Sequence, residues 1–409
     1  MKKSKKAVKS QTALKKTPRT KAADKSKAPV PGHHTLREIL SQPAMWAETY
    51  ANLARHGAIE RLAGQFSAST PWLFVACGSS YYLSQLICAI WSRDFGFRCS
   101  AVAASELLFA PDETLRGSEA RQVVFISRSG ETTEVLRAAE ILKRHADIRT
   151  LGVSCNPSSP LERLCTSTFT LPWADEKSTV MTRSFTSILL SFQRLGAQLK
   201  GDTQLAASLN HLPKTAQPWL DANADRIRQF AAKRRFADFV FLGQGAHYWL
   251  AQEAALKVTE MSASYAQAYH SLEFRHGPRS IAGRDTLITF FVSDAAAKEE
   301  TLLAAELKGL HAANLIIVNR ATPELRAASD LLIPLDLELP EFARFAVTAI
   351  PAHLLGTAVG LRKGLDPDAP KNLTRAVVLG ATAVKLAARA KRTHRANAVN
   401  TSATTGARA

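Results

Sequence analysis

The sequence predicts an α/β protein built on parallel sheets, with one architecture repeated along the chain. Apolar runs lead into small and hydroxyl residues and then into helical patterns at 73–80 and 123–133. A further run at 238–245 repeats the strand and glycine turn of residues 73–78. Buried parallel strands form continuous apolar runs, and their alternation with helices is typical of a doubly wound sheet. We therefore expect two similar units, each a mostly parallel sheet flanked by helices.

The first unit is expected over residues 67–202, after an N-terminal helical segment at 33–66. Thr35 and Glu38 have the spacing of a capping box, which predicts the start of that helical segment. Apolar runs predict the strands of the unit, and apolar residues at helical spacing predict its helices. The strands are expected near 73–77, 99–103, 122–127, 149–154 and 167–171, and the helices near 81–95, 132–145, 160–165 and 184–200.

The second unit is expected over residues 236–378, after a charged helical linker at 203–235. Its order of elements repeats that of the first unit. The strands are expected within 238–245 and near 286–292, 314–318 and 331–335, and the helices near 247–261, 297–312 and 341–363. The longest apolar stretch, 345–361, is interrupted by Pro351 and His353 and is predicted to be a buried helix, not a membrane span.

Charge is concentrated at the two ends of the chain. Of the net charge of +18 over 409 residues, residues 1–32 contribute +10 and residues 381–409 contribute +6, so the body is nearly neutral. The ends lack the apolar residues needed to pack, so 1–32 and 379–409 are expected to be basic disordered tails. Solvated appendages are the expected role of these tails, and neither a nucleic acid nor a membrane is an expected partner.

The five cysteines and the absence of familiar motifs narrow the class of protein. The cysteines form no C-x-x-C pair, and the lysine-rich start has no apolar stretch behind it, which favours reduced thiols in a cytoplasmic protein. No His, Cys, Asp or Glu cluster has metal-ligand spacing, and no complete nucleotide-binding loop is present. We expect neither a metal nor another cofactor.

The segment from Val123 to Thr133 predicts a phosphate site. A buried strand ends in a turn with Gly130, and the helix that follows points its positive end at the turn. The hydroxyl groups at this turn are donors for an anion, and Arg128 adds a charge; the hydroxyl residues are Ser127, Ser129, Thr132 and Thr133. Gly78, Ser79 and Ser80 end a second strand in the same way. Serine, glycine and threonine also serve ordinary turns and caps, so the pattern alone leaves a structural role open.

Three further residues supply acid, base and charge. Lys257 and Glu260 are three residues apart on one helix face, and His276 precedes a Gly-Pro turn. A surface ion pair and a solvated histidine are the plain alternatives. With a phosphate cradle, however, they are the groups needed for aldose–ketose chemistry, where a carboxylate moves a proton between carbons and a histidine opens the ring.

These segments together resemble a known family. The sequences at 77–80, 127–132, 182–186, 255–260 and 273–278 are similar to those of tandem sugar isomerase (SIS) domain proteins. They resemble the isomerase half of glucosamine-6-phosphate synthase and, more closely, the tagatose-6-phosphate ketose/aldose isomerase family, regarded as galactosamine-6-phosphate deaminase/isomerases. Arg128 and the Thr-x-Arg-Glu-Ile of the first helix favour the second group. The resemblance covers about residues 35–378.

The resemblance implies a role for each site residue. It implies that Ser127, Arg128, Ser129 and Thr132 bind the sugar phosphate, with Gly78, Ser79, Ser80 and Thr182 close by. It also implies that Glu260 moves the proton, His276 assists ring opening and Lys257 orients the sugar. A homodimer or higher homo-oligomer is expected, because in such enzymes the histidine commonly reaches the neighbouring subunit's site.

Two departures from the synthase favour release of ammonia. The chain begins Met1-Lys2-Lys3 without a glutaminase domain, so we do not expect glutamine as the nitrogen source. Arg375 stands where the synthase has a Schiff-base lysine, and a protonated guanidinium is a poor nucleophile. We expect conversion of a 6-phosphorylated amino sugar, galactosamine 6-phosphate first, to tagatose 6-phosphate and ammonia. A plain aldose–ketose isomerase and a non-catalytic sugar-phosphate sensor are the alternatives.

Overall fold

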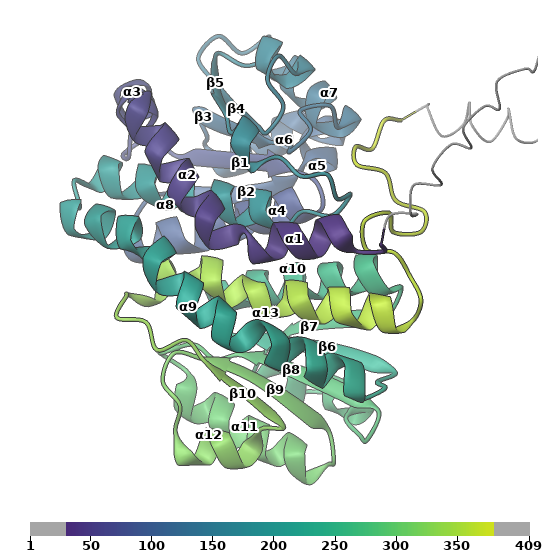
Figure 1. The fold of residues 1–409 in the computed structure, drawn as a ribbon. Coiled ribbons are helices and arrows are strands. Elements are labelled where there is room, and N and C mark those ends of the chain that lie inside the picture. Colours follow the sequence, from purple (N-terminus) through teal and green to yellow (C-terminus); the bar gives the residue numbers. More distant parts are fainter. Residues whose placement is uncertain (1–29, 380–409) are drawn as a thin grey trace, which may run out of the picture. The chain divides into compact units, whose positions relative to one another are not determined.

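Two parallel five-stranded sheets organise the chain (Figure 1). The computed structural model describes residues 30–379, so most of both predicted tails lies outside the described residues. The first sheet has the order β2-β1-β3-β4-β5 and the second the order β10-β9-β8-β6-β7. The strands are β1 Trp72–Ala76, β2 Cys99–Ala103, β3 Gln122–Ile126, β4 Arg149–Ser154, β5 Ser167–Thr170, β6 Asp238–Gly243, β7 Tyr265–His270, β8 Thr286–Phe291, β9 Ala313–Val318 and β10 Leu331–Pro334.

The two sheets have the same connectivity. In each sheet the first strand along the chain pairs in parallel with the second on one side and with the third on the other. The fourth and fifth strands continue beyond the third, again in parallel. The change of direction after the first strand makes the carboxyl ends of β1 and β3, and of β6 and β8, the places where ligands bind in such sheets. The predicted α/β fold of two parallel sheets is confirmed.

The central strands form because their residues are apolar on both faces. Every residue of β1 and of β3 is buried, and so is every residue of β8. The helix after each first strand begins at a glycine with the same unusual backbone, Gly78 at φ 56° and ψ −133° and Gly245 at φ 59° and ψ −126°. Residues with a Cβ rarely adopt this conformation, so glycine sets the direction of both helices.

Helices cover the sheets and also lie between the two halves. In Figure 1, α10 runs beside α13, and α10 also packs against α4 of the first half. A main core joins the inner sides of both sheets, and smaller cores lie under the outer helices of each half. The helices are α1 His33–Leu40, α2 Gln42–Arg55, α3 Ala58–Gln65, α4 Ser79–Ile90, α5 Ala104–Phe109, α6 Pro111–Ser118, α7 Thr133–Leu142, α8 Arg183–Lys200, α9 Thr203–Lys233, α10 Ala246–Ser262, α11 Ala297–Gly309, α12 Pro323–Ala328 and α13 Glu341–Arg362.

The structure adds elements that the sequence pattern did not indicate. Strand β7 was not predicted, because its sequence Tyr-Ala-Gln-Ala-Tyr-His is partly polar, as suits its half-buried place at the sheet edge. The short helices α5 and α6 were missed because a proline separates two short apolar patterns. The helix expected at 160–165 is a short 3₁₀ turn, Pro160–Arg163.

The N-terminal helix begins in a different way from the one predicted. Helix α1 starts at His33 after Gly32, so Thr35 and Glu38 lie inside it and form no capping box. Thr35 instead donates to Asp368, and the Glu38 carboxylate accepts from the backbone N–H of Lys177 at 2.7 Å. These bonds tie the first helix to two distant loops. The domain boundaries at 67, 203 and 236 stay a prediction.

Helix α13 is the helix of the described residues that has the length and apolar composition of a membrane span. Its apolar window is 94% buried inside the structure. The helix contacts α10, α9 and α8, as the predicted buried helix should.

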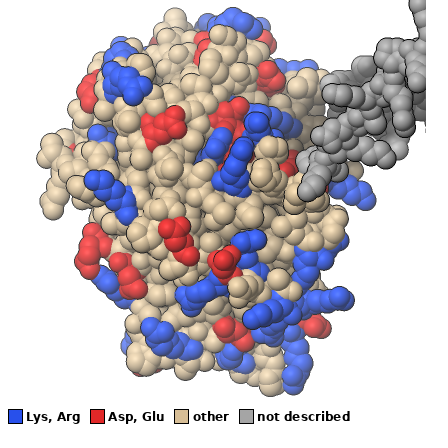
Figure 2. Space-filling model, in the orientation of Figure 1, with Lys and Arg blue, Asp and Glu red and all other residues tan. Residues whose placement is uncertain are grey.

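On the face drawn in Figure 2, which has the orientation of Figure 1, acidic and basic side chains occur side by side.

Candidate functional site

A cavity of about 190 Å³ lies at the carboxyl ends of β1 and β3. Residues from both halves line it: the turns after β1 and β3, helix α10, and the segment 373–377 near the end of the described chain. Ten of the thirteen residues singled out in the sequence for this site are among them: Gly78, Ser79, Ser80, Ser127, Arg128, Ser129, Thr132, Lys257, Glu260 and Arg375. The fold therefore brings together segments that are up to 300 residues apart.

The turn after β3 gathers hydroxyl groups around one point. The Ser127 hydroxyl lies 3.0 Å from that of Thr132 and 3.5 Å from that of Ser129. The Ser127 side chain also accepts from the backbone N–H of Gly130 at 3.1 Å, which holds the turn closed. Among the described residues, the backbone N–H groups of Arg128, Ser129 and Thr132 donate to no protein atom. These open donors at the start of α7 suit an anion.

Gly130 allows the turn to fit against the next strand. Its φ is +66°, in the left-handed region that favours glycine. A Cβ at this position would overlap the side chain of Ser159. The backbone of the turn therefore requires glycine for two independent reasons, conformation and space.

Arg128 lines the cavity but its guanidinium is held by the protein. It lies 3.4 Å from the buried Glu176 carboxylate and donates to the carbonyl oxygens of Thr179 at 2.7 Å and Arg375 at 3.3 Å. Glu176 also accepts from the backbone N–H of Thr182 at 2.6 Å and from its hydroxyl at 2.7 Å. Arg128 thus connects the cradle turn to two neighbouring segments as well as bringing positive charge to the cavity.

Two of the three residues expected to do the chemistry, Lys257 and Glu260, lie on one face of α10. Lys257 is fully buried, and its ammonium group contacts Glu260 and lies 3.5 Å from Glu253. Burial works to lower the pKa of Lys257, but the two carboxyl groups outweigh it and raise that pKa. Burial also raises the pKa of Glu253 to about 8, against the effect of Lys257. Lys257 therefore stays a cation, while the partly exposed Glu260 faces the cavity with a carboxylate.

The segment 373–377 closes one side of the cavity. The Val377 carbonyl accepts from the backbone N–H of Thr133 at 3.1 Å, at the first turn of α7. The side chain of Arg375 forms an ion pair with Asp175, and its carbonyl receives the bond from Arg128. The Arg375 side chain is thus engaged by a carboxylate of the protein.

Three predicted residues, Thr133, Thr182 and His276, do not line this cavity. The Thr133 hydroxyl accepts from the backbone N–H of Leu379 at 3.0 Å. Thr182 is fully buried behind it, where its hydroxyl donates to Glu176. His276 lies in an exposed turn of the second half, between short 3₁₀ turns at Glu273–Arg275 and Pro278–Ile281. Thr182 therefore holds the Glu176 carboxylate, which in turn holds Arg128. Participation of His276 would need a second copy of the chain, and this stays a prediction.

Two carboxylates next to the site were missed in the sequence. Glu253 is four residues before Lys257 and seven before Glu260. This helical spacing places all three on one helix face and is the signal that could have identified Glu253. Glu176 lies in a loop without regular pattern, and its sequence neighbours give no sign that four groups converge on it. Only the folded chain reveals that role.

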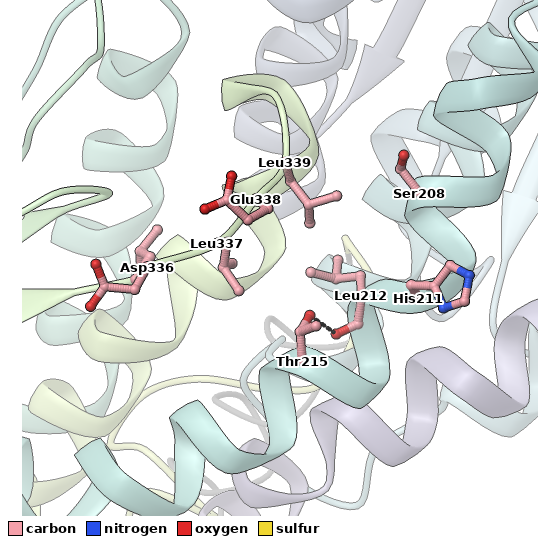
Figure 3. Close-up of a pocket in the computed structure, with 9 residues that line it drawn as sticks. Ser208, His211, Leu212, Thr215, Asp336, Leu337, Glu338 and Leu339 are labelled. Atoms are coloured by element: carbon pink, nitrogen blue, oxygen red, sulfur yellow. Dashed lines mark hydrogen bonds between the residues drawn. The ribbon is translucent and has the colours of Figure 1, made fainter.

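A larger pocket, of about 460 Å³, lies between α9 and the segment after β10 (Figure 3). Leu337 and Leu339 point toward Leu212 of α9 in this view. The nine residues that line the pocket include two carboxylates, Asp336 and Glu338, and neither lysine nor arginine. Because no lysine or arginine lines this pocket, the smaller cavity with Arg128 and Lys257 is the better anion site. Among the described residues no cluster of ligating side chains is arranged for a metal ion.

Comparison with known proteins gives relatives that act on phosphosugars. The chain is 29% identical to the glutamine–fructose-6-phosphate aminotransferase (isomerizing) of Francisella tularensis, over 85% of this chain and 59% of the relative. It is also 29% identical to the crystal structure of glucosamine-6-phosphate deaminase from Thermotoga maritima, with a TM-score of 0.71 over 85% of this chain and all of that one. The chain spans less than two thirds of the length of the aminotransferases that it matches.

A third likeness concerns the fold alone. The tagatose-6-phosphate ketose/aldose isomerase of Escherichia coli superposes with a TM-score of 0.74 at 22% identity, over 86% of this chain and 98% of that one.

The model of the SIS domain family matches residues 68–196 and 237–350, one segment in each half and more than half of the chain. The chain therefore belongs to the SIS domain family of phosphosugar isomerases.

Proposed function

We propose that this protein deaminates and isomerises a 6-phosphorylated amino sugar, yielding the ketose 6-phosphate and ammonia. One observation carries the proposal: the hydroxyl cradle and the Lys257–Glu260 pair line the same cavity. A phosphate held at Ser127–Thr132 would anchor one end of an open-chain sugar. The carboxylate of Glu260 would then lie toward the other end, where the carbonyl chemistry takes place.

The chemistry follows from these groups. In the open-chain amino aldose, Glu260 removes the proton from carbon 2 and returns it to carbon 1. A second proton passes from the amine nitrogen to the former aldehyde oxygen, so that carbon 1 becomes a hydroxymethyl group and carbon 2 a ketimine. Water adds to carbon 2 of the ketimine, and ammonia leaves as the ketone forms. The Lys257 ammonium group favours negative charge on the carbonyl oxygen during the proton transfer. Since Lys257 stays protonated and Arg375 is paired with Asp175, neither is suited to form a covalent imine with the sugar.

The likeness to a deaminase supports an amino sugar phosphate as substrate. The Thermotoga maritima protein, 29% identical to this chain, is named a glucosamine-6-phosphate deaminase. The motif around Arg128 favours galactosamine 6-phosphate as the first substrate. Ammonia release from both amino sugar phosphates should be measured, with tagatose 6-phosphate and fructose 6-phosphate as the expected products.

The Glu260→Gln variant is the control for this assay. It removes the proton carrier but keeps the size of the side chain and a partner for Lys257, so we expect a loss of turnover of about 1,000-fold with sugar-phosphate binding retained. Interconversion of aldose and ketose phosphates without ammonia release from either amino sugar would indicate the plain isomerase. Tight binding without any turnover in the unmodified protein would indicate a sensor.

We further propose that the active form is a homodimer in which His276 completes the site of the partner. The exposed position of His276, outside the cavity of its own chain, supports this arrangement. Mixing the inactive Glu260→Gln and His276→Asn chains, with subunit exchange, should restore about a quarter of the activity, because a quarter of the sites then carry both native residues. If no activity returns after verified subunit exchange, both residues act within one chain.

A further inference from the structure

Two thiols of the first half lie in contact outside the proposed active site. Cys88 is near the end of α4, and Cys99 is the first residue of β2. Their sulfur atoms are 2.7 Å apart, and both are free thiols. A disulfide bond has a sulfur–sulfur length of about 2.05 Å, so bond formation requires an approach of about 0.7 Å.

The surroundings keep these sulfur atoms together. The side chain of Gln85, one turn before Cys88, donates to the carbonyl of Ala101 in β2 at 3.0 Å. The short connection between the two cysteines contains Trp91, which packs edge-on against Phe97 at 5.4 Å between ring centroids. The ring of Phe95 also packs against that of Phe97, at 5.6 Å between centroids. The contact is therefore built into a packed part of the core.

The two thiols differ in access, which assigns an order to their reactions. Cys88 is only 4% exposed, whereas Cys99 is partly exposed at the start of an edge strand. Burial and the neighbouring Cys99 raise the pKa of the Cys88 thiol, so Cys88 is a poor first nucleophile. An oxidant from solvent would therefore react with Cys99 first, and the Cys88 sulfur is already in contact with the Cys99 sulfur.

We propose that Cys88 and Cys99 form a reversible disulfide when the protein meets a peroxide. The Cys99 sulfur attacks the peroxide oxygen, the O–O bond breaks, and a sulfenic acid and one water form. The Cys88 sulfur then attacks the Cys99 sulfur, and the sulfenic oxygen leaves as a second water. Two thiols are oxidised to one disulfide and one hydrogen peroxide is reduced to two waters.

The disulfide would protect the partly exposed thiol of Cys99 from further oxidation and would change the cavity little. Formation of the disulfide ends the oxidation of Cys99 at a reversible stage, before the irreversible sulfinic acid. Because the sulfur atoms already touch, α4 keeps its position, and Ser79 and Ser80 at its other end stay in place. We therefore expect the oxidised protein to retain its catalytic activity within about twofold.

The test is peroxide treatment of the full chain, followed by intact mass and thiol titration under denaturing conditions. The expected result is a mass loss of about 2 Da and the loss of two thiols, both reversed by a reducing agent. The Cys77→Ala variant is the matched control and should still form the cross-link, since Cys77 lines the cavity on another turn.

Two variants make the assignment specific. Cys88→Ala should prevent the mass loss and instead let Cys99 gain oxygen, and Cys99→Ser should prevent both, with circular dichroism confirming that each variant folds. Loss of about 2 Da in either variant would overturn the assignment, because another pair would then be reacting. Unchanged mass and five intact thiols in the treated wild-type protein would overturn the proposal itself.

Discussion

The two halves share one connectivity but differ at the turn where a ligand would bind. Counting outward from the last ladder pairs, Ala76–Ile126 and Gly243–Phe291, aligns the turn after β3 with the turn after β8. The first half then has Ser80, Ser127 and Ser129 at positions where the second half has His247, Val292 and Asp294. Three hydroxyl groups are thus matched by an imidazole, an alkyl group and a carboxylate.

The backbone donors of the two turns also have different partners. The N–H group of Arg128 donates to no protein atom among the described residues, whereas its counterpart at Ser293 donates to the Glu300 carboxylate at 2.8 Å. The hydroxyl of Ser271 donates to the same carboxylate. The second half therefore fills its own anion position with Glu300, and the first half leaves it open. We therefore expect a few side chains to decide which copy of the fold can bind a phosphate.

The largest expected effect comes from giving the turn after β3 the carboxylate that the second half has at the matching position. Ser129→Asp places a carboxylate beside the bound phosphate, and like charges in a partly buried site repel strongly. We expect the affinity for the sugar phosphate to fall by about 1,000-fold, measured by calorimetric titration. Asp294→Asn, which keeps an oxygen for Arg344, is the matched change in the second half and should alter the affinity less than about twofold. Equal effects of the two changes would contradict the asymmetry.

A second change tests the backbone of the cradle. Gly130→Ala should lower the free energy of unfolding by about 3 kcal/mol, because φ is positive and the new Cβ meets Ser159. The second half has Ala295 at the matching position, so its turn follows another path. Gly64→Ala, with open space on an exposed helix, should instead raise the stability by about 0.5 kcal/mol. Denaturant unfolding measures both, and a neutral Gly130→Ala would show that the turn tolerates a side chain.

The third prediction concerns pH. Burial raises the pKa of Glu300 to about 7, against the lowering effect of its bonds from Ser271 and Ser293. Because the folded pKa is above the unfolded one, the folded state holds the extra proton between about pH 4.5 and 7. This contribution to stability is present below that window and is lost as the pH rises through it, by about 2 kcal/mol between pH 5 and 8. Glu300→Gln should remove this part of the pH dependence, as measured by unfolding at both pH values. An unchanged slope would show that Glu300 does not titrate there.

The smallest expected effect comes from Arg128, whose counterpart in the second half is Ser293. Lysine keeps the charge but cannot bond Glu176, Thr179 and Arg375 at once. Arg128→Lys should therefore raise KM about fivefold, through loosening of the segment 373–377, and leave kcat within about twofold. Steady-state kinetics with the better amino sugar phosphate measure both. A loss confined to kcat would point to direct contact of Arg128 with the reacting carbons.

The sequence predicted the sheets and the cradle because both depend on local signals. Continuous apolar runs revealed β1, β3, β6 and β8, and hydroxyl residues around Gly130 revealed the turn that we propose as the anion site. Strand β7 was missed because its partly polar sequence pairs at the edge of a sheet formed by distant segments. Glu176 was missed for the same reason, since its partners come together only in the folded chain.

Two other predicted site residues, Arg128 and Thr182, have partners that the sequence did not reveal. Arg128 was expected to bind phosphate, and the structure shows its guanidinium already bonded to protein groups. Thr182 was expected near the phosphate and lies behind the cavity on Glu176. Both differences come from buried carboxylates, whose positions depend on tertiary packing and not on any local pattern.

Calorimetric titration of a sugar 6-phosphate tests most directly whether the first half alone holds the anion. The wild-type chain should bind one sugar phosphate per chain, and the Ser127→Ala/Thr132→Ala variant should lose at least about 100-fold in affinity. Asp294→Asn should bind as the wild type does. Two equivalents per chain, or full affinity in the Ser127→Ala/Thr132→Ala variant, would contradict the account.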